Sequence, residues 1–183
     1  MNTPSRRAAL TTVSLEQMLV AREQRAARQA AVLARFGKPL VSMTIVTPGS
    51  VKDGPLPRRV MAVALRELEA VSSARNWPIL SREVLWRETG PEAIWAIHVA
   101  PELFKAATVD LEDHHPLGRL WDLDVIAPGR NILSRKELGF PVRRCLICER
   151  PAPECGRSRR HPLEELLNTI KKMVHQYDQQ SIA

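Results

Sequence analysis

Two aspartates separated by one residue carry the clearest chemical signal in the sequence. Residues 112–125 read E-D-H-H-P-L-G-R-L-W-D-L-D-V. If residues 120–126 form a strand, its two-residue period places Asp122 and Asp124 on one face and the apolar residues around them on the other. Paired carboxylates repel each other, and Mg²⁺ held by one or two carboxylates plus substrate phosphates relieves that repulsion. The pair therefore predicts an Mg²⁺ site for phosphoryl or nucleotidyl transfer, with a solvated edge strand as the alternative.

Four further side chains could complete a phosphoryl-transfer site. Glu112 offers a third carboxylate, and His115 lies at a turn from which a general base can reach an attacking hydroxyl group. The sequence leaves these two residues as alternatives for that base. Arg119, and Lys52 in the loop 48–57, are the candidates for neutralising phosphate oxygens. The expected catalytic group is Glu112, His115, Arg119, Asp122 and Asp124.

A cluster of cysteines and a histidine follows the acidic stretch. The spacing is Cys-x2-Cys-x6-Cys-x5-His, and the residues are Cys145, Cys148, Cys155 and His161. Structural Zn²⁺ sites use four such ligands and commonly begin with Cys-x2-Cys, so a Cys₃His zinc site is one interpretation. Three reduced cysteines in a loop are the alternative. A redox Cys-x-x-Cys is less favoured because no thioredoxin-like βαβ pattern surrounds it.

The charge of the chain favours an anionic partner. Its 183 residues carry a formal net charge of +7, and the sequence pI is near 9.9. Residues 101–128 form an acidic island, whereas residues 129–161 are the most basic stretch. Basic side chains at a helix N-terminus or in such a stretch are suited to bound anions. The arginines that we expect to bind substrate are Arg58 and Arg59, in the first turn of a predicted helix, and Arg143 and Arg144.

Composition also narrows the class of protein. Aromatic residues make up only 4% of the chain, and no RNA-recognition signature is present, so nucleic acid is not the expected partner. Apolar runs are short, and the first ten residues lack the apolar segment of a signal peptide. We therefore expect a cytoplasmic protein without a membrane span, which agrees with an odd number of closely spaced cysteines in a reducing compartment.

Periodicity places these side chains in a single α+β domain. Ser14 and Gln17 form a capping box that begins an Arg-rich helix ending at Gly37. Its arginines predict a solvated face, with docking to an acidic partner as the alternative. Strands are expected at 40–47, 79–87, 93–99, 120–126 and 131–134, and helices after Pro55, over 102–111 and from Pro162.

These elements predict a flexible N-terminus over residues 1–12 followed by one compact domain over 13–183. Short strands mixed with about four helices suggest a small mixed sheet. The Cys-rich basic segment occupies residues 143–161. His98 lies within an apolar strand and is expected to be a core histidine rather than a ligand.

Several motifs together resemble the holo-citrate lyase synthase family, that is, apo-citrate lyase phosphoribosyl-dephospho-CoA transferases. The resemblance spans about residues 13 to 175, and its most specific string is H-P-L-G-R-L-W-D-L-D-V from His115. The other matching motifs are P-G-x-x-K-D from Pro48, Arg58-Arg59, I-L-S-R at 132–135, R-R-C-L-I-C-E from Arg143 and the C-x5-H at Cys155. The D-x-D strand is also similar to that of polymerase-β-like nucleotidyltransferases, although Gly118-Arg119 stands where those enzymes have Gly-Ser.

The resemblance implies a reaction and its partners. Enzymes of this family transfer the prosthetic group from 2'-(5''-triphosphoribosyl)-3'-dephospho-CoA to a serine of the citrate lyase acyl carrier (γ) subunit and release pyrophosphate. That reaction suits a carboxylate pair for Mg²⁺ and a basic surface for a small carrier protein. The competing hypothesis is a non-catalytic, zinc-stabilised basic module that binds an acidic protein or RNA and has no use for the aspartates.

Overall fold

The fold is a four-stranded antiparallel sheet with helices on both faces. The structure, a computed structural model, describes residues 11–129 and 132–180. The strand order is β2-β3-β1-β4. The strands are β1 (Leu40–Ile45), β2 (Ile79–Arg87), β3 (Gly90–Ile97) and β4 (Trp121–Ile126). The helices are α1 (Leu15–Phe36), α2 (Pro55–Ala74), α3 (Pro101–His114), α4 (Ala152–Ser158) and α5 (Leu163–Gln180), with 3-10 turns η1 (Gly118–Leu120) and η2 (Lys136–Leu138).

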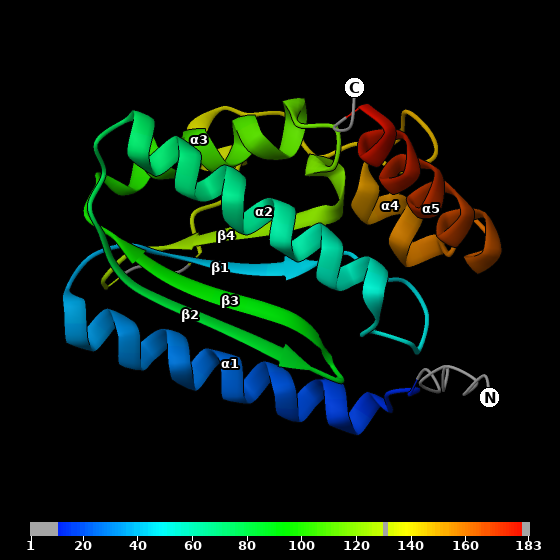
Figure 1. Cartoon of the computed structure of the whole chain (residues 1–183), viewed down its shortest axis with the longest axis horizontal. Helices are drawn as coiled ribbons and strands as arrows, with labels where there is room; N and C mark the ends of the chain where they lie inside the picture. Colours follow the sequence, from blue (N-terminus) through cyan, green and yellow to red (C-terminus); the bar gives the residue numbers. More distant parts are fainter. Residues whose placement is uncertain (1–10, 130–131, 181–183) are drawn as a thin grey trace, which may run out of the picture.

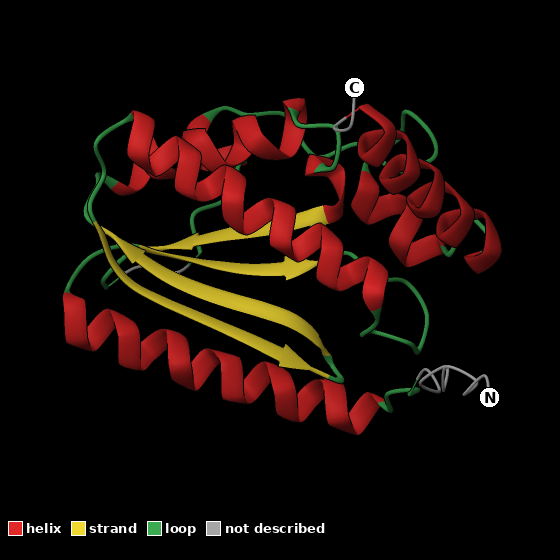
Figure 2. Cartoon of the chain, in the orientation of Figure 1, coloured by secondary structure: helices red, strands yellow, loops and turns green. Residues whose placement is uncertain are grey.

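The sheet separates two hydrophobic layers of unequal size. Helix α1 runs along one face, whereas α2 and α3 cover the other (Figure 1). The larger core lies on the α2 and α3 side and includes Phe104, Trp121 and Ile170, the last from α5. The smaller core, of Leu40, Ile94 and Ile126, packs against α1. Figure 2 shows the sheet enclosed by helices on both sides. The side under α1 therefore has less apolar burial and more room for polar groups.

Helix α1 begins and ends where the sequence predicts. The Ser14 hydroxyl accepts a hydrogen bond from the Gln17 amide at 3.2 Å, and the Ser14 amide donates to the Gln17 side chain at 2.8 Å. Gly37 closes the helix at a φ of 59°, a left-handed conformation that favours glycine. The capping box and the glycine stop are both confirmed.

The sequence predicts a solvated face for the arginines of α1. In the structure, two of them bind buried or half-buried carboxylates of the sheet. Glu92 of β3 is 2% exposed and accepts a hydrogen bond from Arg25 at 2.8 Å and another from Arg28. Arg28 also pairs with Glu83 of β2 at 3.0 Å. A buried carboxylate requires such partners, and α1 supplies them by lying directly over the sheet.

The predicted α+β domain is confirmed, with four differences in detail. The sheet is antiparallel throughout rather than mixed, and five helices are present among the described residues. His98 is exposed because β3 ends one residue earlier, so it is not a core histidine. In the predicted strand at 131–134, Asn131 lies outside the described residues, and Ile132 forms an isolated bridge with Ile126.

Two further points concern the ends of the chain and membranes. The first ten residues of the predicted flexible N-terminus lie outside the described part of the chain. Within the described ranges, no helix combines the length and apolar character that crossing a membrane requires.

Candidate active site and the cysteine-histidine cluster

The two aspartates lie on one face of β4, as the strand period predicts. Asp122 is opposite Thr44 of β1, and Asp124 is opposite Ser42. Ser42 receives a hydrogen bond from Gln29 of α1 at 2.7 Å, so this is the face that α1 covers. The residues that alternate with the aspartates are buried in the larger core on the other side. The local sequence thus directs both carboxylates into the more polar layer.

The two carboxylates differ in their surroundings. The Asp122 side chain is 50% exposed, whereas Asp124 is half-buried and burial is the main influence on its pKa. Burial, and next the negative charge of Asp122, raise the pKa of Asp124 to about 6, although Lys105 partly opposes the shift. A bound cation would stabilise both ionised carboxylates, because it removes the repulsion that raises this pKa. The pair therefore fits a divalent metal supplied together with a phosphate ligand.

A polar cavity brings one aspartate together with basic residues from distant parts of the chain. Its volume is about 210 Å³, and its lining includes Asp122, Lys52, and Arg22 and Arg25 from α1. The Lys52 ammonium donates to the Thr47 carbonyl at 2.6 Å. Burial, and next the charge of Arg22, lower the pKa of Lys52. An anion bound between these cations would stabilise the charged form of Lys52 and offset the effect of burial and of Arg22. The cavity is therefore suited to a polyanionic ligand.

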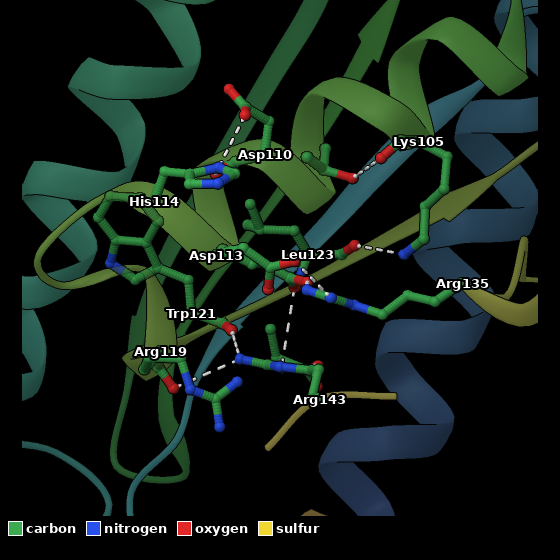
Figure 3. A network of polar contacts seen from close by, with 12 residues as sticks. Lys105, Asp110, Asp113, His114, Arg119, Trp121, Leu123, Arg135 and Arg143 are labelled. Carbon is green, nitrogen blue, oxygen red and sulfur yellow. Dashed lines mark hydrogen bonds and ion pairs between the residues drawn. The ribbon is translucent and has the colours of Figure 1, made fainter. Parts of the chain in front are cut away.

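Strand β4 is the last strand of the sheet, and side chains cover its open edge (Figure 3). The Leu123 amide donates to the Glu112 carboxylate at 2.9 Å, and the Leu123 carbonyl accepts from Lys105 at 3.2 Å. The Trp121 carbonyl accepts from Arg143 at 2.7 Å. Charged side chains in this position satisfy the backbone groups that a neighbouring strand would otherwise bind.

Glu112 is fully engaged in this edge network. Its side chain is 3% exposed and, besides the Leu123 amide, it accepts from Arg135 at 2.5 Å. Arg135 in turn donates to Asp113 at 2.9 Å. Glu112 therefore holds the strand edge and Arg135 in place and is not positioned to take a proton from a substrate.

Arg143 lies beside Asp122, and Arg119 is next to Arg143. Arg143 approaches Asp122 at 3.4 Å and donates to the Arg119 carbonyl at 3.3 Å. The Arg119 guanidinium is half-buried, and its pKa is lowered by burial first and then by the charge of Arg143. Arg143 is thus next to Asp122, as a phosphate-binding role requires, whereas the charged neighbours of the Arg119 guanidinium are Arg143, Asp113, Arg135 and Glu112.

His115 lies on the other side of the sheet from the aspartates. Its ring stacks on Trp121 with centroids 4.4 Å apart and contacts Tyr177 of α5 at 5.3 Å. Its Nδ1 accepts a hydrogen bond from the Leu117 amide at 3.0 Å. Burial is the main cause that lowers its pKa, which favours the neutral ring. The structure therefore does not bring His115 to Asp122 and Asp124, and its contacts stabilise the turn before β4.

Gly118 explains why that turn can approach helix α3 so closely. A Cβ atom at this position would lie 2.2 Å from the Leu111 carbonyl oxygen and 2.7 Å from that of Glu112. Real Cβ atoms do not approach a backbone oxygen so closely, so only glycine fits without a shift of the chain.

Three of the arginines predicted to bind substrate form ion pairs at the surface. Arg58 pairs with Asp53 at 2.6 Å, and Arg59 pairs with Asp178 at 2.8 Å. Arg144 pairs with the exposed Glu149. None of the three lines the polar cavity.

The cysteines and the histidine of the predicted cluster meet in space. One potential ligand atom from each of Cys145, Cys148, Cys155 and His161 lies within 4.8 Å of all the others. The Cys148 and Cys155 sulfurs are 3.6 Å apart, and the His161 Nε2 atom is 3.3 Å from the Cys148 sulfur. Among the described residues this is the only group of three or more such ligands. Glu112 consequently does not join Asp122 and Asp124 as a third ligand.

Sequence reasoning missed several charged residues of the site. Arg22 and Arg25 were assigned to a solvated helix face, and Glu92, Lys105 and Arg135 were given no role. One signal was present for Glu92, since a single carboxylate stands in an otherwise apolar strand, G-P-E-A-I-W-A-I. A lone buried charge of this kind requires a cation from another element.

Comparison with known proteins identifies one family. The family model described as apo-citrate lyase phosphoribosyl-dephospho-CoA transferase matches residues 13–177. A protein with that name from Citrobacter koseri is 43% identical over 170 residues, which cover 93% of each chain. Another with the same name, from Escherichia coli O7:K1, is 42% identical over 166 residues, or 91% of each chain.

Proposed function

The chain belongs to the apo-citrate lyase phosphoribosyl-dephospho-CoA transferase family, and from this membership we propose that it completes the prosthetic group of citrate lyase. It transfers the phosphoribosyl-dephospho-CoA group from 2'-(5''-triphosphoribosyl)-3'-dephospho-CoA to a serine of the acyl carrier (γ) subunit. The observation that carries this proposal is the polar cavity in which Asp122 faces Lys52 and two arginines of α1.

The proposed reaction is a nucleotidyltransferase-type displacement at phosphorus. The serine oxygen attacks the phosphorus nearest the ribose, a phosphodiester bond forms, and the bond to the departing pyrophosphate breaks. The serine proton leaves in the same process. Negative charge increases on the pyrophosphate, so cationic groups that face it should supply most of the rate enhancement.

The proposed roles belong to residues that line the cavity, Asp122, Lys52, Arg22 and Arg25, and to neighbouring residues of β4 and its edge. Asp122 and Asp124 are the groups that would hold Mg²⁺, which neutralises phosphate charge when bound. Lys52 and Arg22 bind the phosphate chain from the opposite wall, and Arg25 is kept in place by its ion pair with Glu92. Arg119 and Arg143 act from the edge of β4.

The remainder of the substrate also finds a suitable surface. An apolar cavity of about 360 Å³ lies between the loop after β1 and helix α5, and Thr47 lines both cavities. One ligand with a polyanionic and a less polar part can therefore extend from one cavity to the other. The exposed arginines of the 143–161 segment, Arg150, Arg157, Arg159 and Arg160, offer a basic surface for an acidic carrier protein.

Replacing Lys52 tests the phosphate-binding role of the polar cavity. We expect Lys52→Met to raise the KM for the triphosphoribosyl substrate by about 10-fold to 100-fold, because a hydrogen bond to a charged group contributes about 1.5 to 3 kcal/mol. The measurement is the initial rate of pyrophosphate release with apo acyl carrier protein as acceptor. Lys172→Met, at an exposed position of α5, is the matched control and should leave the KM unchanged. An unchanged KM in Lys52→Met would contradict the claim that the polar cavity binds the phosphate chain of the substrate.

A further inference from the structure

We propose that Cys145, Cys148, Cys155 and His161 bind one Zn²⁺ ion and that this centre holds Arg143 against the edge of β4. The first part of the proposal concerns the metal and stands without the transfer reaction. The second part rests on the proposed function, since it gives the metal centre a role in positioning a side chain beside Asp122.

The distances between the ligand atoms fit a tetrahedral zinc ion. With Zn–S and Zn–N bonds of about 2.3 Å and 2.0 Å, two sulfurs in a tetrahedron lie roughly 3.8 Å apart, and a sulfur and a nitrogen lie roughly 3.5 Å apart. The 3.6 Å between the sulfurs of Cys148 and Cys155 and the 3.3 Å from the His161 Nε2 atom to the Cys148 sulfur are close to those values, and all the ligand atoms lie within 4.8 Å of one another. Three sulfurs and one imidazole complete four ligands, which is the set of a closed structural site. Soft thiolates together with imidazole select zinc over magnesium or calcium.

The histidine of the cluster has the partner that a zinc-bound imidazole normally has. Its Nε2 atom faces the Cys148 sulfur, and its Nδ1 atom lies 3.5 Å from the Glu165 carboxylate on the first turn of α5. A carboxylate at the second ring nitrogen fixes the orientation of the ring and increases its strength as a ligand. The His161 side chain is 13% exposed, which leaves little freedom to turn away.

The surrounding segment has little else to hold it together. Between residues 143 and 161, Cys155 is the only buried residue and Leu146 is the only one packed against the larger core, so hydrophobic burial accounts for little of the order of this segment. The backbone forms a tight turn in which the Cys145 amide donates to the Arg150 carbonyl at 2.7 Å, and the Ala152 amide donates to the Arg143 carbonyl at 2.8 Å. This turn presents Cys145 and Cys148, while Cys155 comes from α4 and His161 precedes α5. A metal that joins the three parts supplies the missing stabilisation.

The same turn positions Arg143. This residue stands two positions before Cys145, its carbonyl accepts from Ala152 inside the turn, and its guanidinium reaches the Trp121 carbonyl and Asp122. Loss of the metal should loosen the turn and release the arginine from β4. The Zn²⁺ centre is therefore a positioning element and makes no contact with substrate.

Metal analysis of the full-length protein tests the first part of the proposal. We expect elemental mass spectrometry of protein purified from zinc-supplemented medium to give about one zinc per chain. Cys148→Ser should reduce this to below about 0.1 per chain, whereas His175→Ala, at an exposed histidine of α5, should leave it unchanged. Wild-type protein without zinc, with iron in its place, or with a disulfide between Cys148 and Cys155 would overturn the assignment. These contradicting results are all measured on the wild-type protein, so they depend neither on transfer activity nor on the folding of a variant.

Hydrogen exchange of the wild-type protein tests the second part. After removal of the metal by a chelator, the amides of Cys145 and Ala152 should exchange at least about 10-fold faster, while those of β1 and β3 keep their protection. Transfer activity should fall to the level of Arg143→Ala and return when Zn²⁺ is added. Unchanged exchange at both amides in zinc-free protein, or full activity without zinc, would overturn the positioning role and leave the metal assignment to the elemental analysis.

Discussion

Replacing Asp124 with asparagine is expected to abolish transfer and, at the same time, to stabilise the metal-free protein. The variant loses one of the two carboxylates that we propose to hold Mg²⁺, and loss of one such electrostatic group commonly lowers kcat by about 10²-fold to 10³-fold. The pKa of Asp124 is raised to about 6, chiefly by burial, so the ionised group disfavours the folded state at neutral pH. A neutral amide avoids that cost, and we expect a gain of about 2 kcal/mol in the free energy of unfolding.

The pH dependence of this gain follows from the sign of the pKa shift. In the unfolded chain the Asp124 carboxyl loses its proton near its ordinary value of 3.8, whereas in the folded protein it keeps the proton until about pH 6. The unfolded state therefore binds fewer protons in this window, and the contribution of the group to stability falls as pH rises from about 4 to about 6. Denaturant unfolding in metal-free buffer should show that the free energy of unfolding of Asp124→Asn increasingly exceeds that of the wild type as pH rises across that range.

Asp110→Asn is the matched control for Asp124→Asn. Asp110 is an exposed carboxylate of α3 that pairs only with His114 among the ion pairs of the described residues, and its loss should change neither kcat nor stability by a large factor. A folded Asp124→Asn protein with full transfer activity would contradict the metal-binding role of this pair.

Removal of the Glu112 carboxylate should have the largest effect on stability. Glu112→Ala leaves the Leu123 amide and the Arg135 guanidinium without their buried acceptor. Breaking a buried ion pair by removing one partner costs about 3 to 5 kcal/mol, so equilibrium denaturation should show a loss of that size. Glu112→Gln keeps an oxygen for the Leu123 amide and should lose less.

The same pair of variants separates a positioning role from that of a general base. Asp113→Asn, which removes the more exposed acceptor of Arg135, is the control and should cost less than about 1 kcal/mol. If Glu112 were the base, Glu112→Gln would lose turnover far beyond what its loss of stability explains. We expect instead that stability decreases and that turnover falls no more than this disturbance of β4 explains.

The sequence predicted those features of the site that depend on local periodicity or spacing. The alternation around Asp122 and Asp124 determined their shared face, because a strand has a period of two wherever it lies in a sheet. The cysteine spacing likewise indicated a common site, and the four side chains do meet. Capping by Ser14 and the stop at Gly37 are equally local, and both were correctly located.

The roles of Glu112 and His115 depended on information that one segment does not contain. Both residues stand close to the aspartates in sequence, but β4 is an edge strand, and its open backbone groups recruit Glu112. His115 is drawn to the other side of the sheet by Trp121, whose place in the larger core is set by helices α2, α3 and α5. The ion pairs of Arg25 and Arg28 similarly require the approach of α1 to a buried glutamate 64 or more residues away.

The central claim, transfer of the prosthetic group at the cavity beside Asp122, is tested most directly by intact-mass spectrometry of the acyl carrier subunit. The subunit is incubated with this protein, triphosphoribosyl-dephospho-CoA and Mg²⁺, and a parallel sample contains EDTA. We predict a mass gain equal to one phosphoribosyl-dephospho-CoA group in the first sample and none in the second. A gain that persists in EDTA would contradict the Mg²⁺ site, and no gain in either sample, with folded protein and a competent acceptor, would contradict the proposed transfer.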